Sequence, residues 1–147
     1  MTSLLNSNVV WFYLSNIVAQ LGNKAFRMKK TYLNLLPIPK ISEEKQKIFE
    51  ILVDYIMYLK EYKKEKYIID FFERVINIAV YELYFEDEIK SNAYQIIDIL
   101  IKDLEEFDNS YKTIQNIYKN ISNKNHKVAY AVNYVDTLDI VKIIENK

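Results

Sequence analysis

The stretch PIPKISEEKQKIFEILVDYIMYL, residues 37–59, predicts how the chain is organised. Its two prolines favour an extended backbone, because a proline disfavours helical geometry in the residue before it. Ser42 follows as a predicted helix N-cap, with two glutamates in the first turn, where the helix dipole favours negative charge. Apolar residues then recur at helical spacing: Ile48, Phe49, Leu52, Val53, Ile56 and Leu59. The stretch therefore predicts a boundary followed by an amphipathic helix that extends to about residue 62.

Similar apolar stripes occur on both sides of this boundary. Upstream, a stripe over 10–21 predicts a helix, and residues 25–29 alternate loosely like one short strand. Downstream, stripes predict helices over 71–83, 89–104 with a break near Asn92, 110–121, 129–134 and 138–144. The last three segments include capping candidates: Asn109 or Ser110 for the first, and Asp136 or Thr137 for the last.

The composition supports a helical fold. One glycine and two prolines among 147 residues fall far below the usual roughly 7% and 5%, whereas sandwiches and barrels need many turn residues. A hydrophobic fraction of 50% is enough for the core of a single-domain chain. We therefore predict a mainly α fold, a helical bundle-like array with at most one short β-hairpin or strand near residues 25–29. Without cysteine, a disulfide framework and a thiolate zinc site are excluded.

Residues 1–23 carry no charge, so a membrane segment has to be considered. Asparagine, serine and glutamine interrupt this run, which leaves fewer than the roughly 20 consecutive apolar residues that a spanning helix needs. No basic segment precedes it, as a signal peptide would require. We expect no membrane partner and a cytoplasmic location.

The charged residues are unevenly distributed. Residues 1–40 contain no acidic side chain, so all 20 acidic residues fall within 41–147. Such asymmetry indicates a polyanionic partner, because lysine and arginine bind phosphates and arginine also reads guanine edges. The candidate DNA-binding residues are Lys24, Arg27, Lys29 and Lys30. On the residues alone, an ordinary solvated loop explains this segment equally well.

The chain lacks the usual catalytic motifs. With Gly22 as its single glycine, it has no phosphate-binding glycine loop, and one histidine without cysteine excludes the common nucleophile sets. His126 lies in a polar turn and is predicted to be a cap or a solvent-facing residue. The acidic run 86–88 is predicted to be the solvated first turn of a helix, ahead of a metal site. A tyrosine stripe predicts core packing ahead of a base-stacking platform, and it comprises Tyr55, Tyr58 and Tyr62. No catalytic, metal-binding or cofactor-binding residue is predicted.

Four passages carry a family resemblance. They are LLNSNVVWFYL (4–14), AFRMKKTYLNLLPIPKIS (25–42), VINIAVYELYFEDEI (75–89) and NHKVAYAVNYVDTLDIVKIIENK (125–147). In this order they resemble the end of the target-recognition domain and the C-terminal helical region of TaqI-like adenine-specific DNA methyltransferases. That family includes the single-chain type IIG restriction–modification enzymes of bacterial defence.

The resemblance implies a division of the chain into two parts. Residues 1–40 would be the terminal part of a DNA target-recognition domain, beginning in the middle of an element, and residues 41–147 a C-terminal helical domain. The expected function is that of a non-catalytic fragment that contributes to DNA recognition and scaffolds the enzyme. Its partners would be DNA, bound weakly through the basic segment, and the missing methyltransferase portion or another protein chain. No cofactor is expected, because the family's glycine-containing cofactor loop and its Asn-Pro-Pro-Tyr motif are not in this sequence.

Two alternatives stay open. The chain could be a helical protein–protein interaction module without DNA binding. It could also be a fragment of a type I restriction specificity subunit, whose recognition domains likewise end in a Pro-x-Pro segment followed by a long helix. The second alternative would require a longer coiled coil than residues 43–66 provide.

Overall fold

The computed structural model describes residues 8, 12 and 40–146. Within these residues the chain forms seven α-helices and one 3-10 helix, and no strand, which confirms the mainly α prediction. The elements are α4 (Glu43–Glu61), α5 (Lys66–Tyr84), α6 (Glu86–Ser91), α7 (Ile97–Asp103), α8 (Tyr111–Ile121), α9 (Lys127–Tyr134), η1 (Val135–Thr137) and α10 (Asp139–Glu145). Apart from residue 12, the predicted helix over 10–21 lies outside the described residues, and so does the predicted strand near 25–29.

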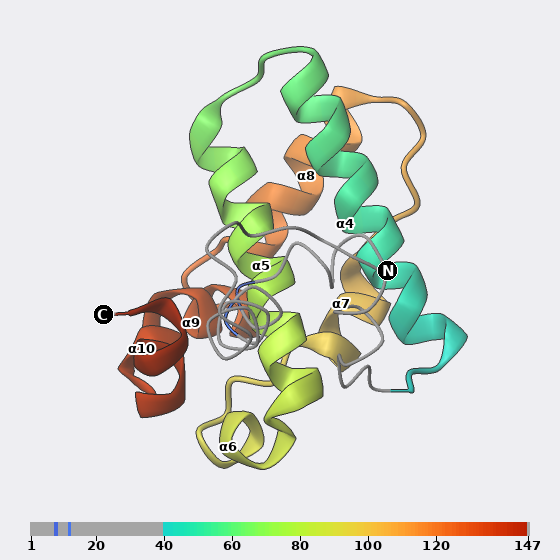
Figure 1. Cartoon of the computed structure of the whole chain (residues 1–147). Coiled ribbons are helices and arrows are strands. Elements are labelled where there is room, and N and C mark those ends of the chain that lie inside the picture. The colour runs from blue at the N-terminus through green and yellow to red at the C-terminus, as the bar shows by residue number, and fades with distance from the viewer. Residues whose placement is uncertain (1–7, 9–11, 13–39, 147) are drawn as a thin grey trace, which may run out of the picture.

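Helix α4 begins as the sequence predicts. The Ser42 side chain accepts a hydrogen bond from the backbone N–H of Lys45 at 3.3 Å, and the first turn contains Glu43 and Glu44. Its apolar stripe is buried, and the helix ends at Glu61. The chain then turns and returns as α5, so that α4 and α5 form an antiparallel pair (Figure 1).

Helix α5 lies at the centre of the described structure. Helices α4 and α7 lie on one side of it, and α9 and α10 on the other (Figure 1). Residues 78–81 are four consecutive positions, about 100° apart around the helix axis, and all four are buried. The nearly unbroken apolar run VINIAVYEL explains this, because a helix that is apolar on all sides is stable only when neighbours surround it.

Aromatic rings connect α4, α5 and α8 within the core. Phe72 is completely buried, and its ring meets Tyr55 edge-on with centroids 5.5 Å apart. Tyr118 of α8 lies 5.2 Å from Phe71 and 6.4 Å from Phe72. This aromatic packing holds α8 against the first half of α5.

The ends of the later helices agree with the sequence only in part. The predicted break near Asn92 is confirmed, since α6 ends at Ser91 and α7 begins at Ile97. Ser110 is the N-cap position of α8, but its side chain caps nothing; the Asp108 carboxylate instead accepts hydrogen bonds from the Ser110 backbone N–H (3.1 Å) and the Thr113 hydroxyl (3.0 Å).

The predicted cap of the last helix was wrong. The N-cap position of α10 is Leu138, which has no capping side chain. Asp136 instead pairs with Arg74 of α5, and the Thr137 hydroxyl donates to the Tyr134 carbonyl at 2.7 Å. Both side chains therefore have other partners before α10 begins. They belong to the 3-10 helix η1, which the sequence did not indicate.

Substitution of Phe72 by alanine tests the central packing. Because Phe72 is completely buried between α4 and α8, Phe72→Ala should lower the free energy of unfolding by about 3–5 kcal/mol. The matched control is Met57→Ala, which shortens a 64% exposed side chain and should stay within about 0.5 kcal/mol of the parent. Urea unfolding followed by circular dichroism measures both; similar values for the two variants would contradict the central role of α5.

Candidate functional site

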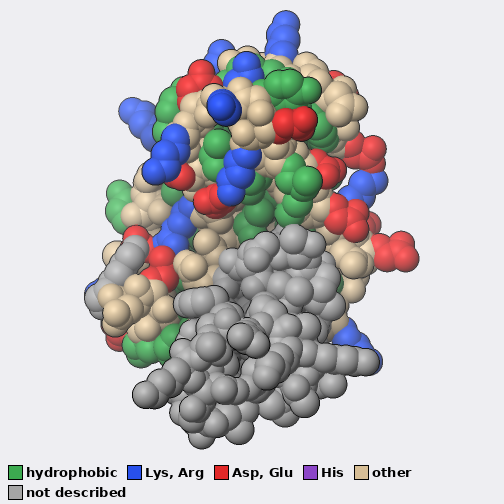
Figure 2. Space-filling model, turned by 45° about the horizontal axis from the view of Figure 1, so that its top comes forward, with side chains coloured by type: hydrophobic (Ala, Val, Ile, Leu, Met, Phe, Trp, Pro, Cys, Tyr) green, Lys and Arg blue, Asp and Glu red, His purple; other side chains and the backbone are tan. Residues whose placement is uncertain are grey.

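The predicted DNA-binding residues Lys24, Arg27, Lys29 and Lys30 lie outside the described residues, and their role stays a prediction. On the described surface in Figure 2, lysine and arginine side chains are interspersed with acidic ones, and acidic side chains recur along the right-hand edge, where α4 lies in Figure 1. This face of the helices therefore presents a mixed charge pattern.

A buried carboxylate joins α5 to α7. Glu82 belongs to α5, and its Oε2 accepts hydrogen bonds from the backbone N–H groups of Ile96 (2.7 Å) and Ile97 (3.0 Å). It thereby satisfies two free N–H groups at the start of α7. Burial raises the pKa of Glu82, and the two backbone hydrogen bonds oppose that rise. Glu82 was not among the residues predicted from the sequence, although a lone glutamate within the apolar run VINIAVYELY is a usable signal.

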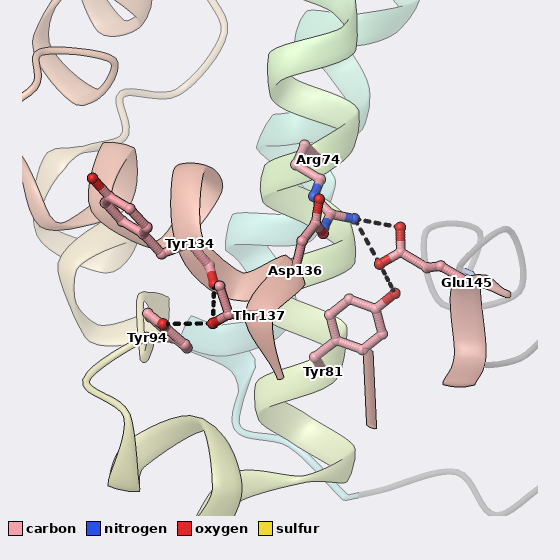
Figure 3. Close-up of polar contacts among 7 residues, drawn as sticks. All are labelled: Arg74, Tyr81, Tyr94, Tyr134, Asp136, Thr137 and Glu145. Atoms are coloured by element: carbon pink, nitrogen blue, oxygen red, sulfur yellow. Dashed lines mark hydrogen bonds and ion pairs between the residues drawn. The ribbon is translucent and has the colours of Figure 1, made fainter. Parts of the chain in front are cut away.

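A second cluster joins α5 to the C-terminal helices (Figure 3). The Arg74 guanidinium donates through Nη1 to both carboxylate oxygens of Glu145, at 2.8 and 3.0 Å, and through Nη2 to Asp136. The Tyr81 hydroxyl donates to Glu145 Oε2 at 2.9 Å, and burial raises the pKa of this tyrosine. The side chains of Arg74 and Glu145 are only 17% and 10% exposed, so the pair is well shielded from water.

One contact reaches the same face of α5 from the N-terminal part of the chain. The backbone N–H of Asn8 donates to Asn77 Oδ1 at 3.2 Å. Asn77 lies one helical turn from Arg74 and from Tyr81. The described part of residues 1–40 therefore touches α5 beside the Arg74 cluster.

The single histidine acts as a helix cap, as predicted. His126 Nδ1 accepts a hydrogen bond from the Val128 backbone N–H at 3.1 Å, at the start of α9. Because Nδ1 is an acceptor, Nε2 carries the proton and donates to Asp103 of α7 at 2.6 Å. The His126–Asp103 pair thus links the end of α7 to the beginning of α9.

The acidic run 86–88 is also placed as predicted. All three residues are exposed in the first turn of α6, and Glu86 pairs with Lys90 one turn later. Within the part of the chain that the structure describes, no group of three or more histidine, aspartate or glutamate side chains is arranged to hold a metal ion.

The tyrosine stripe on α4 leads from the core to the surface. Tyr55 is completely buried, its hydroxyl donates to the Glu105 carbonyl, and burial raises its pKa to about 12. Tyr58 is half-buried, whereas Tyr62 is 57% exposed. The prediction of core packing is therefore confirmed for Tyr55, while the outer two rings line an open groove.

This α4 groove has a volume of about 550 Å³. It is lined by Asp54, Met57, Tyr58, Glu61, Tyr62, Phe107 and Asn109. The rings of Tyr58 and Tyr62 lie 4.5 Å apart, and Phe107 meets Tyr58 edge-on at 5.2 Å. Its wall is therefore aromatic, with the carboxylates of Asp54 and Glu61 at its margin.

Comparison with family models, curated proteins and solved structures found no match. The resemblance to adenine-specific DNA methyltransferases therefore stays a prediction from the sequence. None of the described helices has the length and apolar character needed to cross a bilayer. The class that the described structure defines is a mainly α protein with shielded polar clusters between its helices and one aromatic groove on α4.

The pH dependence of stability tests the burial of Glu82. Its pKa is higher in the folded chain than the ordinary value of 4.5, so the folded state takes up this proton more readily than the unfolded state. As the pH falls from 7 toward 4.5, this group's contribution to the free energy of unfolding should therefore rise. The Glu82→Gln variant lacks this titration.

We accordingly expect the free energy of unfolding of the parent minus that of Glu82→Gln to grow as the pH falls through this window. Urea unfolding at a series of pH values measures the difference, in which the other carboxylates, common to both proteins, cancel. Parallel pH profiles for the two proteins would contradict the raised pKa.

Substitution of Arg74 tests the second cluster. Arg74→Met keeps the aliphatic stem but removes the cation that pairs with two carboxylates, one of them in a shielded position. We expect a loss of about 2–3 kcal/mol in the free energy of unfolding, somewhat below the roughly 3–5 kcal/mol of a fully buried pair. Hydrogen exchange should show a larger loss of protection in α10 than in α4.

The matched control for this substitution is Lys60→Met. Lys60 pairs with Glu73 at 2.8 Å between α4 and α5, but both side chains are much more exposed. An exposed pair contributes up to about 1 kcal/mol, so this variant should lose less stability than Arg74→Met. Equal losses, or equal protection of α10 in both variants, would show that the Arg74 cluster does not hold the C-terminal helices.

Proposed function

We propose that the chain is a non-catalytic part of a type IIG-like restriction–modification DNA methyltransferase. In this proposal residues 41–147 form a helical scaffold, and residues 1–40 contribute to DNA target recognition. The partners are DNA and the methyltransferase portion of such an enzyme, or another protein chain that supplies it. A partner of this kind implies a cytoplasmic location.

The observation that carries the scaffold role is the use of the shielded polar side chains. Glu82 caps α7, the Arg74–Glu145 pair binds α10 to α5, and His126 binds Asp103. Carboxylate, guanidinium and imidazole groups in shielded positions are also the groups that catalysis uses. Here their partners are helix ends and neighbouring helices, which supports a structural role for this region.

The charge distribution supports different roles for residues 1–40 and residues 41–147. The first forty positions contain five basic residues and no acidic one, whereas residues 41–147 contain 15 basic and all 20 acidic side chains. The net negative charge of residues 41–147 opposes the approach of phosphate, so we expect DNA to bind through Lys24, Arg27, Lys29 and Lys30. The contact of Asn8 with Asn77 supports α5 as the platform for this first part.

One observation favours the second candidate function, a protein–protein interaction module without DNA binding. The α4 groove exposes Met57 and Tyr62 on a helix whose opposite face is buried. The third possibility, a type I specificity subunit, receives no such support. Helix α4 ends at Glu61 and α5 folds back along it, which is unlike the long coiled coil of such a subunit.

The salt dependence of DNA binding tests the proposal. Four neutralised phosphates predict a slope of about −3.6 in log affinity against log salt, which is roughly a 150-fold loss between 50 and 200 mM. Arg27→Ala combined with Lys29→Ala should remove about half of this slope and leave the fold intact. Fluorescence anisotropy of a labelled duplex measures the affinities.

The control removes two lysines from the helical part. Lys112 and Lys119 are exposed on α8, and replacing both by alanine should leave the slope unchanged. DNA binding that ignores both salt and the Arg27/Lys29 change would eliminate the basic segment as the contact surface. Absence of detectable binding at low salt would favour the protein-interaction module instead.

A further inference from the structure

Helix α4 carries two separate stripes of side chains. The first, apolar, faces α5 and α7 and is buried. The second follows the spacing i, i+3, i+4, i+7 and i+8 along the outer face, and it consists of Asp54, Met57, Tyr58, Glu61 and Tyr62. Helical geometry places these five residues on one face, where they line the α4 groove together with Phe107 and Asn109. The outer stripe is therefore a surface built by one helix and one loop.

The groove exposes apolar and aromatic groups. Met57 is 64% exposed and Tyr62 is 57% exposed, although both neighbour the half-buried ring of Tyr58. Apolar side chains of this size, rimmed by polar residues, are typical of interaction surfaces. Aromatic rings and methionine are also the residue types enriched where proteins bind one another.

The charge at the margin of the groove is negative. Asp54 and Glu61 are both exposed and lie seven positions apart, which separates their Cα atoms by about 10 Å along the helix. Among the described residues neither carboxylate has an ion-pair partner, whereas the nearby Lys60 is paired with Glu73. These two carboxylates would repel phosphate and attract a cation, so the sign of the rim argues against a nucleic acid and for a basic ligand.

The same aromatic cluster already holds a cation. The Nζ atom of Lys64 lies 4.4 Å from the ring centroid of Tyr111. That ring is stacked on Tyr58, a wall of the groove, at 6.4 Å and an interplanar angle of 23°. A lysine ammonium thus already uses one end of the cluster as a cation–π surface. At the other end Tyr58 and Tyr62 line the groove.

We propose that the α4 groove binds a basic peptide segment of a partner protein, with two arginines three positions apart and apolar residues between them. In the polyproline II conformation such arginines lie on one side of the peptide about 9 Å apart, which matches the spacing of the two carboxylates. Arginine suits both parts of the site, because its planar guanidinium pairs with carboxylates and stacks on tyrosine rings. The apolar residues between the arginines contact Met57 and Tyr62. This interaction surface does not depend on the proposed role in DNA recognition.

A labelled synthetic peptide tests the proposal. The probe carries fluorescein, two arginines three positions apart, and proline and leucine between them, flanked by glycine and serine. Its anisotropy should rise saturably when the full chain is added, and the affinity should fall as salt is raised. A second peptide with glutamates in place of the arginines should not bind, and one with adjacent arginines should bind several-fold more weakly.

Variants of the chain locate the binding. Asp54→Asn combined with Glu61→Gln keeps the size of both side chains and removes the rim charge, and it should weaken binding of the two-arginine peptide about threefold to tenfold. Tyr62→Ala should weaken it by a similar factor. The matched control is Glu50→Gln combined with Asp70→Asn, which removes two exposed carboxylates outside the groove and should change the affinity less than twofold.

All four changed carboxylates are exposed, so circular dichroism should show folded proteins in both double variants. Three outcomes would overturn the proposal. The first is no saturable binding of the two-arginine peptide up to about 1 mM. The second is equal weakening by the groove variant and the control variant, which would show general attraction to an acidic surface. The third is equal binding of the peptides with spaced and adjacent arginines.

Discussion

The burial of the second half of α5 on all sides is the constraint from which the other helices take their positions. Its residues 78–81 are buried at four successive angles around the axis, so neighbours are needed in every direction. Helix α4 covers one side, α9 covers another, and α6 continues from its C-terminal end (Figure 1). The described elements after α5 are all of 11 residues or fewer, so several short helices together cover the sides that α4 leaves open.

Hydrophobic burial alone does not fix how short helices are oriented, because it has no preferred direction. The polar contacts supply this direction. Glu82 accepts hydrogen bonds from the two N–H groups at the start of α7. Arg74 binds Glu145 near the end of α10, and His126 binds Asp103 between α7 and α9. Each contact joins helices far apart in sequence, and each would be costly to break because its groups are shielded from water. The packing and these contacts therefore define one arrangement of the short helices.

The two proposed binding surfaces have opposite charge. The basic residues of the first forty positions suit a polyanion, whereas the carboxylate-rimmed groove on α4 suits a cation. In the two proposals, DNA and a basic protein segment therefore bind different residues of the chain. Helix α4 itself has two different faces, because its inner stripe packs on α5 whereas its outer stripe lines the groove.

The amino-acid sequence by itself determined the features that depend on near neighbours. The Ser42 cap, the helical stripes, the break near Asn92 and the cap formed by His126 are all local, since each involves residues within a few positions. The tertiary structure decided which distant groups meet. Asp136 was a plausible cap for α10, but its carboxylate instead pairs with Arg74, which lies 62 positions away. Glu82 likewise caps a helix that begins 15 positions later. The outer rings of the tyrosine stripe likewise became a groove only because the loop with Phe107 packs beside them. Helical periodicity shows that a face exists, but what covers that face depends on the path of the whole chain.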